Sequence, residues 1–216
     1  MNTYKIGSEN IDLILIKNIL DSNQKIELSK SQANIVNESR EFLEKKINSS
    51  NEPIYGVNTG FGSLHNIKID SKQLNKLQEN LIISHACGVG EVISNKVVKT
   101  MLLLKIISLS KGYSGVHINT INRLIFFYNE DIFPIIYSYG SLGASGDLVP
   151  LAHLSLPLIG KGKVEYKGKV FESSVILNKF NLKPVKLLSK EGLALLNGTQ
   201  FMCAYATFLL LESYKV

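Results

Sequence analysis

The chain has 216 residues, of which 45% are hydrophobic and 19% are charged, so it holds enough apolar material for one large domain or two small ones and has an ordinary globular composition. Its net charge of +6 comes from lysines scattered along the sequence, whereas arginine occurs only at Arg40 and Arg123. Surfaces that bind nucleic acids concentrate arginine among aromatic residues. The dispersed charge therefore predicts a solvated basic surface and no nucleic-acid partner.

The N-terminal segment mixes lysine, glutamate and aspartate into its apolar residues. It lacks the uninterrupted apolar region of a signal peptide, which predicts a cytoplasmic protein. Two cysteines, Cys87 and Cys203, are far apart and have no metal-ligand spacing. Both are expected to be reduced thiols, and no metal site is predicted.

Helical periodicity predicts a first long helix from about residue 30 to residue 48, with Ser29 and Gln32 as its capping box. The glycine-rich segment EPIYGVNTGFGSLHN that follows favours an irregular loop. Asp70 and Gln73 have the spacing of a second capping box, and they predict a helix that ends at the glycines of SHACGVG. The predicted inner face of that helix carries Leu74, Leu77, Leu81 and His85.

The second half of the chain is also mostly helical in pattern. A largely buried helix is predicted from Ser94 to Gly112, and another from about Ile118 to Asn129. The segment GSLGASGDLVPLAHL indicates a tight turn that leads into a helix. Alternation in KVEYKGKVFE predicts a small hairpin at Lys167 and Gly168, and a long final helix is predicted from near Ser189.

Within the final helix, the uncharged stretch from Leu193 to Leu211 is about long enough to span a bilayer. Asn197, Thr199 and Gln200 lie inside it, where hydrocarbon would leave them unpaired at a cost of several kcal/mol each. We therefore expect a helix buried among other helices and no contact with a membrane. The helix reaches Val216 without a glycine, a proline or a cap, so its continuation or its packing partners are expected to lie outside this sequence.

The most specific motif is GASGD, residues 143–147. It does not fit the GxSxG motif of hydrolases, because an aspartate stands where the second glycine is required. The backbone offers another chemistry: the amide nitrogen of Gly146 attacks the carbonyl of Ala144 to close a five-membered ring, and loss of two waters turns Ser145 into a dehydroalanine-like methylene. The product is an electrophile, methylidene-imidazolone, and the small side chains permit its closure. Taken alone, these residues fit a simple small-residue turn better.

Three further segments accompany this motif: YGVNTGFG, SHACGVG and EGLALLNGTQ. Together with GASGDLVPLAH, they stand in the order and with roughly the separations found in the histidine and phenylalanine ammonia-lyases, so the chain resembles that family from about residue 50 to its end. The resemblance implies a mainly α-helical, fumarase/aspartase-like ammonia-lyase fold. Residues 1–216 would form the N-terminal domain that bears the prosthetic group, with a small β-hairpin, and residues 189–216 would begin the central helical bundle.

In this family the prosthetic group forms from the chain itself, so no metal or diffusible cofactor is expected. The residues that would form it are Ala144, Ser145 and Gly146. Capture of the substrate amine by this electrophile makes nitrogen a better leaving group. Tyr55 corresponds to the family's base, which removes the β-proton of the substrate. Asn58 and Gly60 are expected to shape the loop that holds Tyr55, and Asp147 is expected to assist proton transfers during ring closure.

Substrate recognition is implied for His85, Asn197 and Gln200. The alternative for Asn197 is a buried polar residue that satisfies a helix break near Gly198, and the two roles are compatible. The family position of His85 faces the substrate ring: histidine there accompanies histidine or tyrosine as the substrate, whereas phenylalanine enzymes carry an apolar residue. The Ser84-His85 pair resembles the histidine enzymes more, so the first hypothesis is elimination of ammonia from L-histidine to give urocanate. A tyrosine or phenylalanine ammonia-lyase, an aminomutase, and an inactive fragment that only binds other subunits remain alternatives. Family members are homotetramers, so a homo-oligomer acting on a small amino acid is expected.

Overall fold

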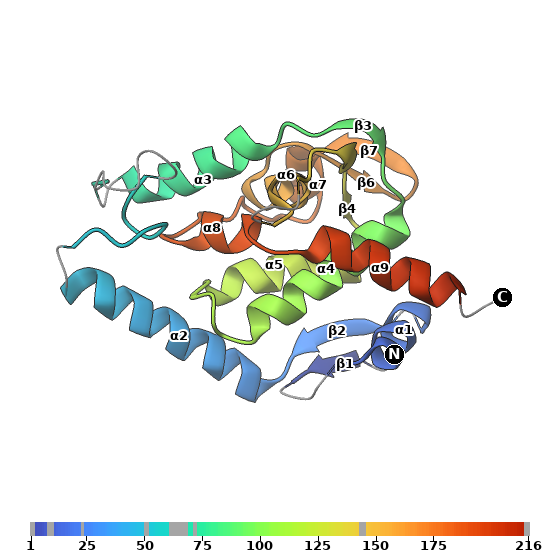
Figure 1. Cartoon of the computed structure of the whole chain (residues 1–216), viewed down its shortest axis with the longest axis horizontal. Coiled ribbons are helices and arrows are strands. Elements are labelled where there is room, and N and C mark those ends of the chain that lie inside the picture. Colours follow the sequence, from blue (N-terminus) through green and yellow to red (C-terminus); the bar gives the residue numbers. More distant parts are fainter. Residues whose placement is uncertain are drawn as a thin grey trace.

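The computed structural model describes residues 3–7, 11–22, 24–49, 52–60, 69–70, 73–142 and 146–213. Helices predominate, and Figure 1 shows them packed around a common centre. They are α1 (Leu13–Asp21), α2 (Lys30–Ser49), α3 (Leu74–His85), α4 (Asn95–Ser110), α5 (Ile118–Asn129), α6 (Leu148–Ser155), the 3-10 helix η3 (Leu156–Ile159), α7 (Ser173–Lys179), α8 (Glu191–Leu196) and α9 (Gln200–Ser213). The strands are β1 (Thr3–Ile6), β2 (Lys25–Leu28), β3 (Val89–Val92), β4 (Phe133–Pro134), β5 (Tyr137–Tyr139), β6 (Lys163–Tyr166) and β7 (Lys169–Glu172).

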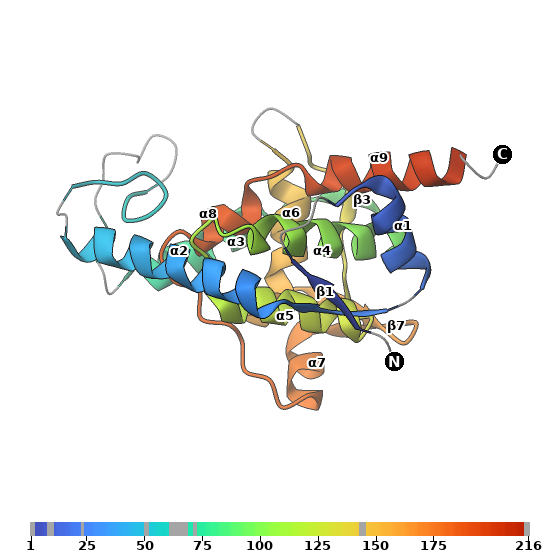
Figure 2. The same cartoon turned by 90° about the horizontal axis from the view of Figure 1, so that it is seen from below.

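Helix α4 forms the centre of the core. It is apolar on nearly all sides, and a helix of that kind is stable in water only when other elements surround it. Helices α5 and α9 pack against it, and Figures 1 and 2 both show α9 lying beside α4. Its buried apolar side chains are Val97, Val98, Met101, Leu102, Leu103, Ile106 and Leu109. The buried helix predicted between Ser94 and Gly112 is thereby confirmed, as is the helix predicted from Ile118 to Asn129.

The N-terminal residues form a small unit that periodicity does not predict. Strand β1 pairs in parallel with β2, beginning with Thr3 opposite Lys25, and α1 connects the two strands. The carboxylate of Asp12 caps α1 by accepting the amide N–H of Leu15 at 2.8 Å. Strands of four residues are too short for their alternation to stand out from the surrounding sequence, which is why the unit escaped prediction.

The predicted start of α2 is partly wrong. The hydroxyl oxygen of Ser29 accepts the amide N–H of Gln32 at 3.2 Å, as a cap should, but the side-chain amide of Gln32 donates to the main-chain oxygen of Ser110 at the end of α4. That side chain therefore joins α2 to α4 and does not return to Ser29. The N-cap of α3 is Gln73, whose own side chain makes no cap hydrogen bond. The capping box assigned to Asp70 and Gln73 stays a prediction, because it includes residues 71–72, which lie outside the described residues.

The predicted hairpin is confirmed. Strands β6 and β7 pair antiparallel, with Tyr166 opposite Lys169. The two turn residues, Lys167 and Gly168, have φ angles of 51° and 72°, as a type I′ turn requires at both central positions. Strand β4 extends the hairpin to a three-stranded sheet, while β3 pairs separately with β5.

The long helix predicted from near Ser189 is wrong, because the segment forms two helices. Helix α8 ends and α9 begins on either side of residues 197–199, which we call the α8–α9 junction. The amide N–H of Met202, in the first turn of α9, donates to the buried carboxylate of Asp147 at 3.0 Å, so a side chain from another segment stabilises the second helix start. Together, α8 and α9 are long and apolar enough to cross a membrane by length and composition. Asn197, Thr199 and Gln200 lie at or beside the helix break, and α9 packs on α4. Only Ala204 and Thr207 of α9 are buried, so the helix expected to be buried among other helices is covered on one side only.

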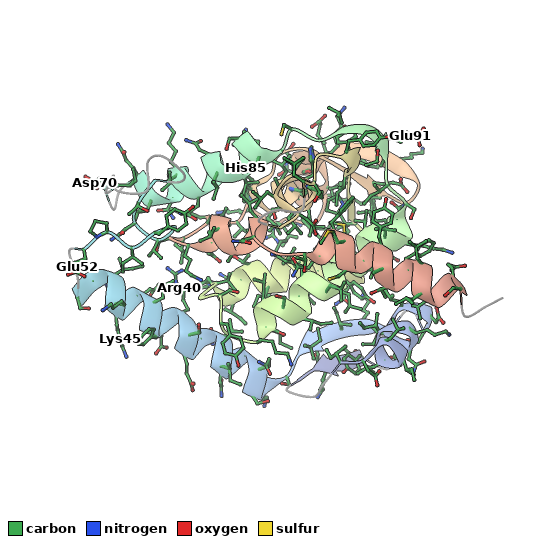
Figure 3. All side chains as sticks on the ribbon, viewed as in Figure 1. Arg40, Lys45, Glu52, Asp70, His85 and Glu91 are labelled. Carbon is green, nitrogen blue, oxygen red and sulfur yellow. The ribbon has the colours of Figure 1, made fainter. Side chains whose placement is uncertain are left out.

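Two charged side chains fix the start of α8. The guanidinium of Arg40 donates to the main-chain oxygens of Gly115 at 3.1 Å and Ser189 at 3.0 Å, and Figure 3 shows Arg40 on the side of α2 that faces the rest of the molecule. The fully buried carboxylate of Glu191, in the first turn of α8, accepts the amide N–H of His117 at 2.9 Å. The N-terminal end of α8 is therefore anchored, and its C-terminal end leads into the α8–α9 junction.

Candidate active site

The ring-forming motif precedes α6 in the sequence. Ala144 and Ser145 lie outside the described residues, whereas Gly146 is described. Gly146 has a φ angle of +114°, and its main chain lies against Gly198 of the α8–α9 junction. A Cβ at position 146 would lie 2.6 Å from the carbonyl oxygen and 3.0 Å from the amide nitrogen of Gly198. Any other residue there would have to displace the junction as well as adopt a strained backbone.

Asp147 reinforces this contact with three hydrogen bonds. Its main-chain N–H donates to the carbonyl oxygen of Gly198 at 2.7 Å. Its fully buried carboxylate accepts the hydroxyl of Ser141 at 2.8 Å and the amide N–H of Met202 at 3.0 Å. Asp147 therefore holds the end of the ring-forming segment both to the chain that precedes it and to the start of α9. Its part in proton transfer during ring closure stays a prediction.

The two residues predicted to bind substrate in α8–α9 lie on either side of Gly198. Asn197 is exposed and is the C-cap of α8, where its N–H donates to the carbonyl oxygen of Leu193 at 2.9 Å. Gln200 is the first residue of α9, and its side-chain amide lies against Gly198. The Oε1 atom of Gln200 is buried and has no hydrogen-bond partner among the described residues.

A lysine that sequence periodicity did not single out lies beside the junction. Lys105 of α4 is 1% exposed, and its Nζ lies 3.5 Å from the main-chain oxygen of Asn197. Burial lowers the pKa of Lys105 to about 7. The sequence carries a signal that could have revealed it, since this lysine interrupts the apolar run MLLLKIIS of a helix predicted to be buried.

His85 is the last residue of α3, and Figure 3 shows it at that end of the helix. Its Nδ1 lies 2.8 Å from the carbonyl oxygen of Leu81 and 3.2 Å from the hydroxyl oxygen of Ser84. A carbonyl oxygen can only accept, so Nδ1 carries the proton and Nε2 of the neutral ring is an acceptor. His85 and Leu77 are both half-buried. The inner face predicted for α3 therefore runs along the edge of the face that is buried.

The segment after His85 is held on α6 by His153. The Nε2 atom of His153 accepts the amide N–H of Gly88 at 3.0 Å, and the ring of Tyr137 meets the imidazole edge-on with 5.2 Å between centroids. Burial lowers the pKa of His153, which favours the neutral ring that this contact requires. A Cβ at Gly88 would lie 3.0 Å from Nε2 of His153 and 3.2 Å from Cγ1 of Val149. Helix α6, which follows the ring-forming motif, thus fixes the segment that carries His85.

Tyr55 belongs to a loop, residues 52–60, that follows α2 and lies far from the C-terminal end in Figure 1. The side chain of Asn58 closes the loop by accepting the amide N–H of Ile54 at 2.6 Å. The carbonyl oxygen of Gly60 accepts the hydroxyl of the preceding threonine at 2.9 Å. Tyr55 itself is 56% exposed. The loop is therefore internally ordered, and it presents the phenol at the surface.

The structure brings one group of the predicted residues together. Gly146 and Asp147 meet the α8–α9 junction, with Asn197 and Gln200 on either side of it, and His85 is joined through its neighbouring segment to α6. The approach of Tyr55 to this group stays a prediction. Sequence reasoning missed three residues that hold the group in place: Lys105, Ser141 and Gly198.

Comparison with known proteins identifies the class that this fold and site define. Residues 11–216 match the aromatic amino acid lyase model, so the chain belongs to that family. It is 48% identical to a histidine ammonia-lyase of Legionella pneumophila (strain Lens) over 196 residues, which cover 91% of this chain and 38% of that protein. Histidine ammonia-lyase from Trypanosoma cruzi superposes with a TM-score of 0.85 at 31% identity, over 96% of this chain and 40% of that one. Tyrosine aminomutase from Streptomyces globisporus superposes with a TM-score of 0.87 at 32% identity, over 95% of this chain and 38% of that one.

These likenesses confirm the predicted mainly α-helical ammonia-lyase fold. They also show that the chain spans about two fifths of the length of these relatives, from 38% to 40%.

Proposed function

We propose that this chain is the part of a histidine ammonia-lyase that forms the electrophile and helps to recognise the substrate, in a reaction that eliminates ammonia from L-histidine to give urocanate. The observation that carries the proposal is the contact of Gly146 and Asp147 with Gly198, which sets the ring-forming segment against the junction that bears Asn197. Relatives named histidine ammonia-lyase, at 48% and 45% identity, support histidine as the substrate. We propose turnover for a protein that also contains the part corresponding to the remaining three fifths of those relatives.

The residues present fit a methylidene-imidazolone formed from Ala144, Ser145 and Gly146. Closure requires the amide nitrogen of Gly146 to reach the carbonyl carbon of Ala144, so the chain must fold back on itself, and the φ of +114° at Gly146 is a conformation that a side chain would oppose. The main chain and the carboxylate of Asp147 are both hydrogen-bonded, which fixes one side of the bend. The group, when formed, supplies an electrophile for the substrate amine. We propose no metal or diffusible cofactor.

We assign recognition of the substrate ring to His85. Its Nδ1 is committed to the carbonyl oxygen of Leu81, which leaves Nε2 as an acceptor. An imidazole N–H or a phenol O–H can donate to that atom, whereas the ring of phenylalanine cannot, so the contact favours histidine or tyrosine over phenylalanine. The exposed amide of Asn197 and the Oε1 of Gln200, which has no hydrogen-bond partner in the described part of the chain, add two polar groups on either side of Gly198.

We assign removal of the β-proton to Tyr55, whose loop is ordered by Asn58 and Gly60 and whose ring is open to approach. Tyr55 is proposed to meet the rest of the site in the assembled enzyme. That enzyme is proposed to be a cytoplasmic homotetramer of histidine catabolism, with no nucleic-acid or membrane partner.

Measurement of intact mass tests ring formation. The wild-type chain should be lighter than its sequence by two waters, whereas Ser145→Ala, which has no hydroxyl to eliminate, should not lose the second water. Ser84→Ala, a serine outside the motif, should keep the wild-type deficit and serves as the matched control. A folded wild-type chain of full, unmodified mass would overturn the proposal.

Production of urocanate tests the reaction. Histidine should be converted when the chain is combined with a separately expressed C-terminal half, and Tyr55→Phe in the same mixture should remove the base and abolish conversion. Turnover of tyrosine without turnover of histidine would refute histidine as the substrate. A β-amino acid as the main product would show that the protein is an aminomutase.

A further inference from the structure

Lys105 is the one basic residue in the innermost part of the described core. It is 1% exposed, and its neighbours along α4, Met101, Leu102 and Leu109, are at most 1% exposed. Lysine is rarely buried to this extent, because removing an ammonium group from water is costly unless the protein offers a strong partner. The position therefore calls for a specific role.

Pairing with a carboxylate does not explain the burial of Lys105. Within the described residues, the fully buried carboxylates are those of Asp147 and Glu191, and their oxygens accept hydrogen bonds from Ser141, Met202, His117, Thr120 and Leu188. Lys105 takes part in none of the ion pairs formed there. Its hydrogen bond goes to a main-chain oxygen, that of Asn197 at 3.5 Å.

That main-chain oxygen belongs to Asn197, the residue that follows the C-terminal end of α8. Helix α8 ends at Leu196, and the last carbonyls of a helix have no partner within it. An amine beside the end of a helix satisfies such an oxygen and interacts favourably with the helix dipole. The next residue, Gly198, is the one that touches Gly146 and accepts the main-chain N–H of Asp147. Lys105 therefore acts one residue away from the contact that holds Gly146 and Asp147.

We propose that Lys105 is a positioning residue for ring formation: from the buried helix α4, its amine holds the main chain at Asn197, and thereby keeps Gly198 where Gly146 and Asp147 bind to it. The inference rests on the proposed function, since it concerns the maturation of the same electrophile. Both forms of the lysine side chain carry N–H donors, so the contact persists whether or not the amine is protonated.

Two matched variants separate this role from a general contribution to the core. Lys105→Met keeps a long apolar side chain but has no donor, whereas Ile106→Ala opens a cavity at the neighbouring, fully buried position and leaves Lys105 in place. Lys105→Arg restores a cationic donor. Urea titration gives the free energy of unfolding of each variant. The maturation rates are then compared between variants of known stability.

Two readouts are used. The first is the rate at which the chain loses two waters, followed by intact mass at intervals after cell-free synthesis. Lys105→Met should mature about tenfold more slowly, the effect expected from losing one buried hydrogen bond. The second is hydrogen exchange at the amide of Asp147, which should become faster in Lys105→Met, because its acceptor Gly198 is no longer held. Ile106→Ala should be close to wild type in both, and Lys105→Arg should recover most of the rate.

The outcomes distinguish the inference from the proposed function. A wild-type chain that keeps its full mass refutes the proposed function. A wild-type chain that matures, together with Lys105→Met that matures and exchanges like Ile106→Ala of equal stability, refutes the role of Lys105. If Lys105→Met does not fold, Lys105→Leu, which also lacks a donor, takes its place with the same expected slowing, and a wild-type rate in that variant refutes the role.

Discussion

At the scale of the residue, Gly146 and Gly168 can be compared directly, because they share a positive φ angle and differ in what surrounds them. Both have positive φ angles, of +114° and +72°, but a Cβ at Gly146 would lie 2.6 Å from the carbonyl oxygen of Gly198, whereas a Cβ at Gly168 would meet nothing within 4 Å. Gly146→Ala should therefore lower the free energy of unfolding by about 3 kcal/mol, from backbone strain and overpacking combined. Gly168→Ala should cost only about 1 kcal/mol, from backbone strain alone. Urea titration measures both, and equal costs would show that the junction yields freely at Gly146.

The residues of the site differ in how far sequence could reveal them. Gly146 and His85 stand in motifs that resemble an enzyme family, so their importance could be predicted before their surroundings were known. Lys105 and Gly198 could not be ranked in this way, because their roles depend on contacts with residues that are far away in sequence. Lys105 lies 92 positions from Asn197, and only folding brings α4 to the end of α8.

At the scale of the element, the start of α9 depends on Asp147 in a way that can be compared with a simple cap. Asp12 caps the exposed start of α1 by accepting one amide N–H at 2.8 Å. Asp147 accepts the N–H of Met202 and also the hydroxyl of Ser141, and it is fully buried. Asp12→Ala should cost about 1 kcal/mol. Asp147→Ala should cost about 3 kcal/mol, because the hydroxyl of Ser141 and the amide N–H of Met202 both lose a buried acceptor. Thermal unfolding followed by circular dichroism measures both, and a similar cost for the two variants would argue against the anchoring of α9 by Asp147.

The helices show why some elements are predictable from sequence and others are not. The apolar runs and boundary residues of α4 and α5 are visible in their own sequences. The ends of both helices were therefore predicted to within a residue or two. The break between α8 and α9 was predicted only as an alternative role of Asn197, because the local sequence otherwise favours a continuous helix and the competing hydrogen bonds come from Asp147. The pair β1 and β2 was missed because each strand has four residues and its partner lies beyond a helix.

At the scale of the whole molecule, the buried charges of the described residues converge on one element. Arg40 donates to Ser189 just before α8, and Glu191 lies in its first turn. Asp147 and Lys105 hold the junction at its other end. Helix α8 has only six residues, too few to be stable by itself. The buried charged side chains, which are the groups most costly to remove from water, thus hold a short helix in place. The end of that helix places Asn197 next to Gly198, which contacts Gly146.

This arrangement predicts how the stability of the whole fold depends on pH. Burial lowers the pKa of Lys105 from 10.5 to about 7. Between these values the unfolded chain binds a proton at Lys105 that the folded chain does not, so the free energy of unfolding must rise with pH across this window. The stabilisation is complete above the unfolded pKa and is lost as the pH falls toward the folded pKa. From pH 7.5 to 9.5, this residue should add about 2 kcal/mol.

Urea titrations across that range test the prediction, with Lys105→Met as the variant that lacks the group. The wild-type free energy of unfolding should rise by about 2 kcal/mol more than that of Lys105→Met. Lys96→Met, which removes an exposed lysine of the same helix, should keep the wild-type pH dependence. The range stops at pH 9.5 because burial and Asp131 raise the pKa of Tyr128 to about 12, so that ionisation of this tyrosine in the unfolded chain would add an opposite trend at higher pH. Identical pH dependence in wild type and Lys105→Met would mean that water reaches the amine of Lys105 in the folded protein, and the centre of the core would then be more open than its packing indicates.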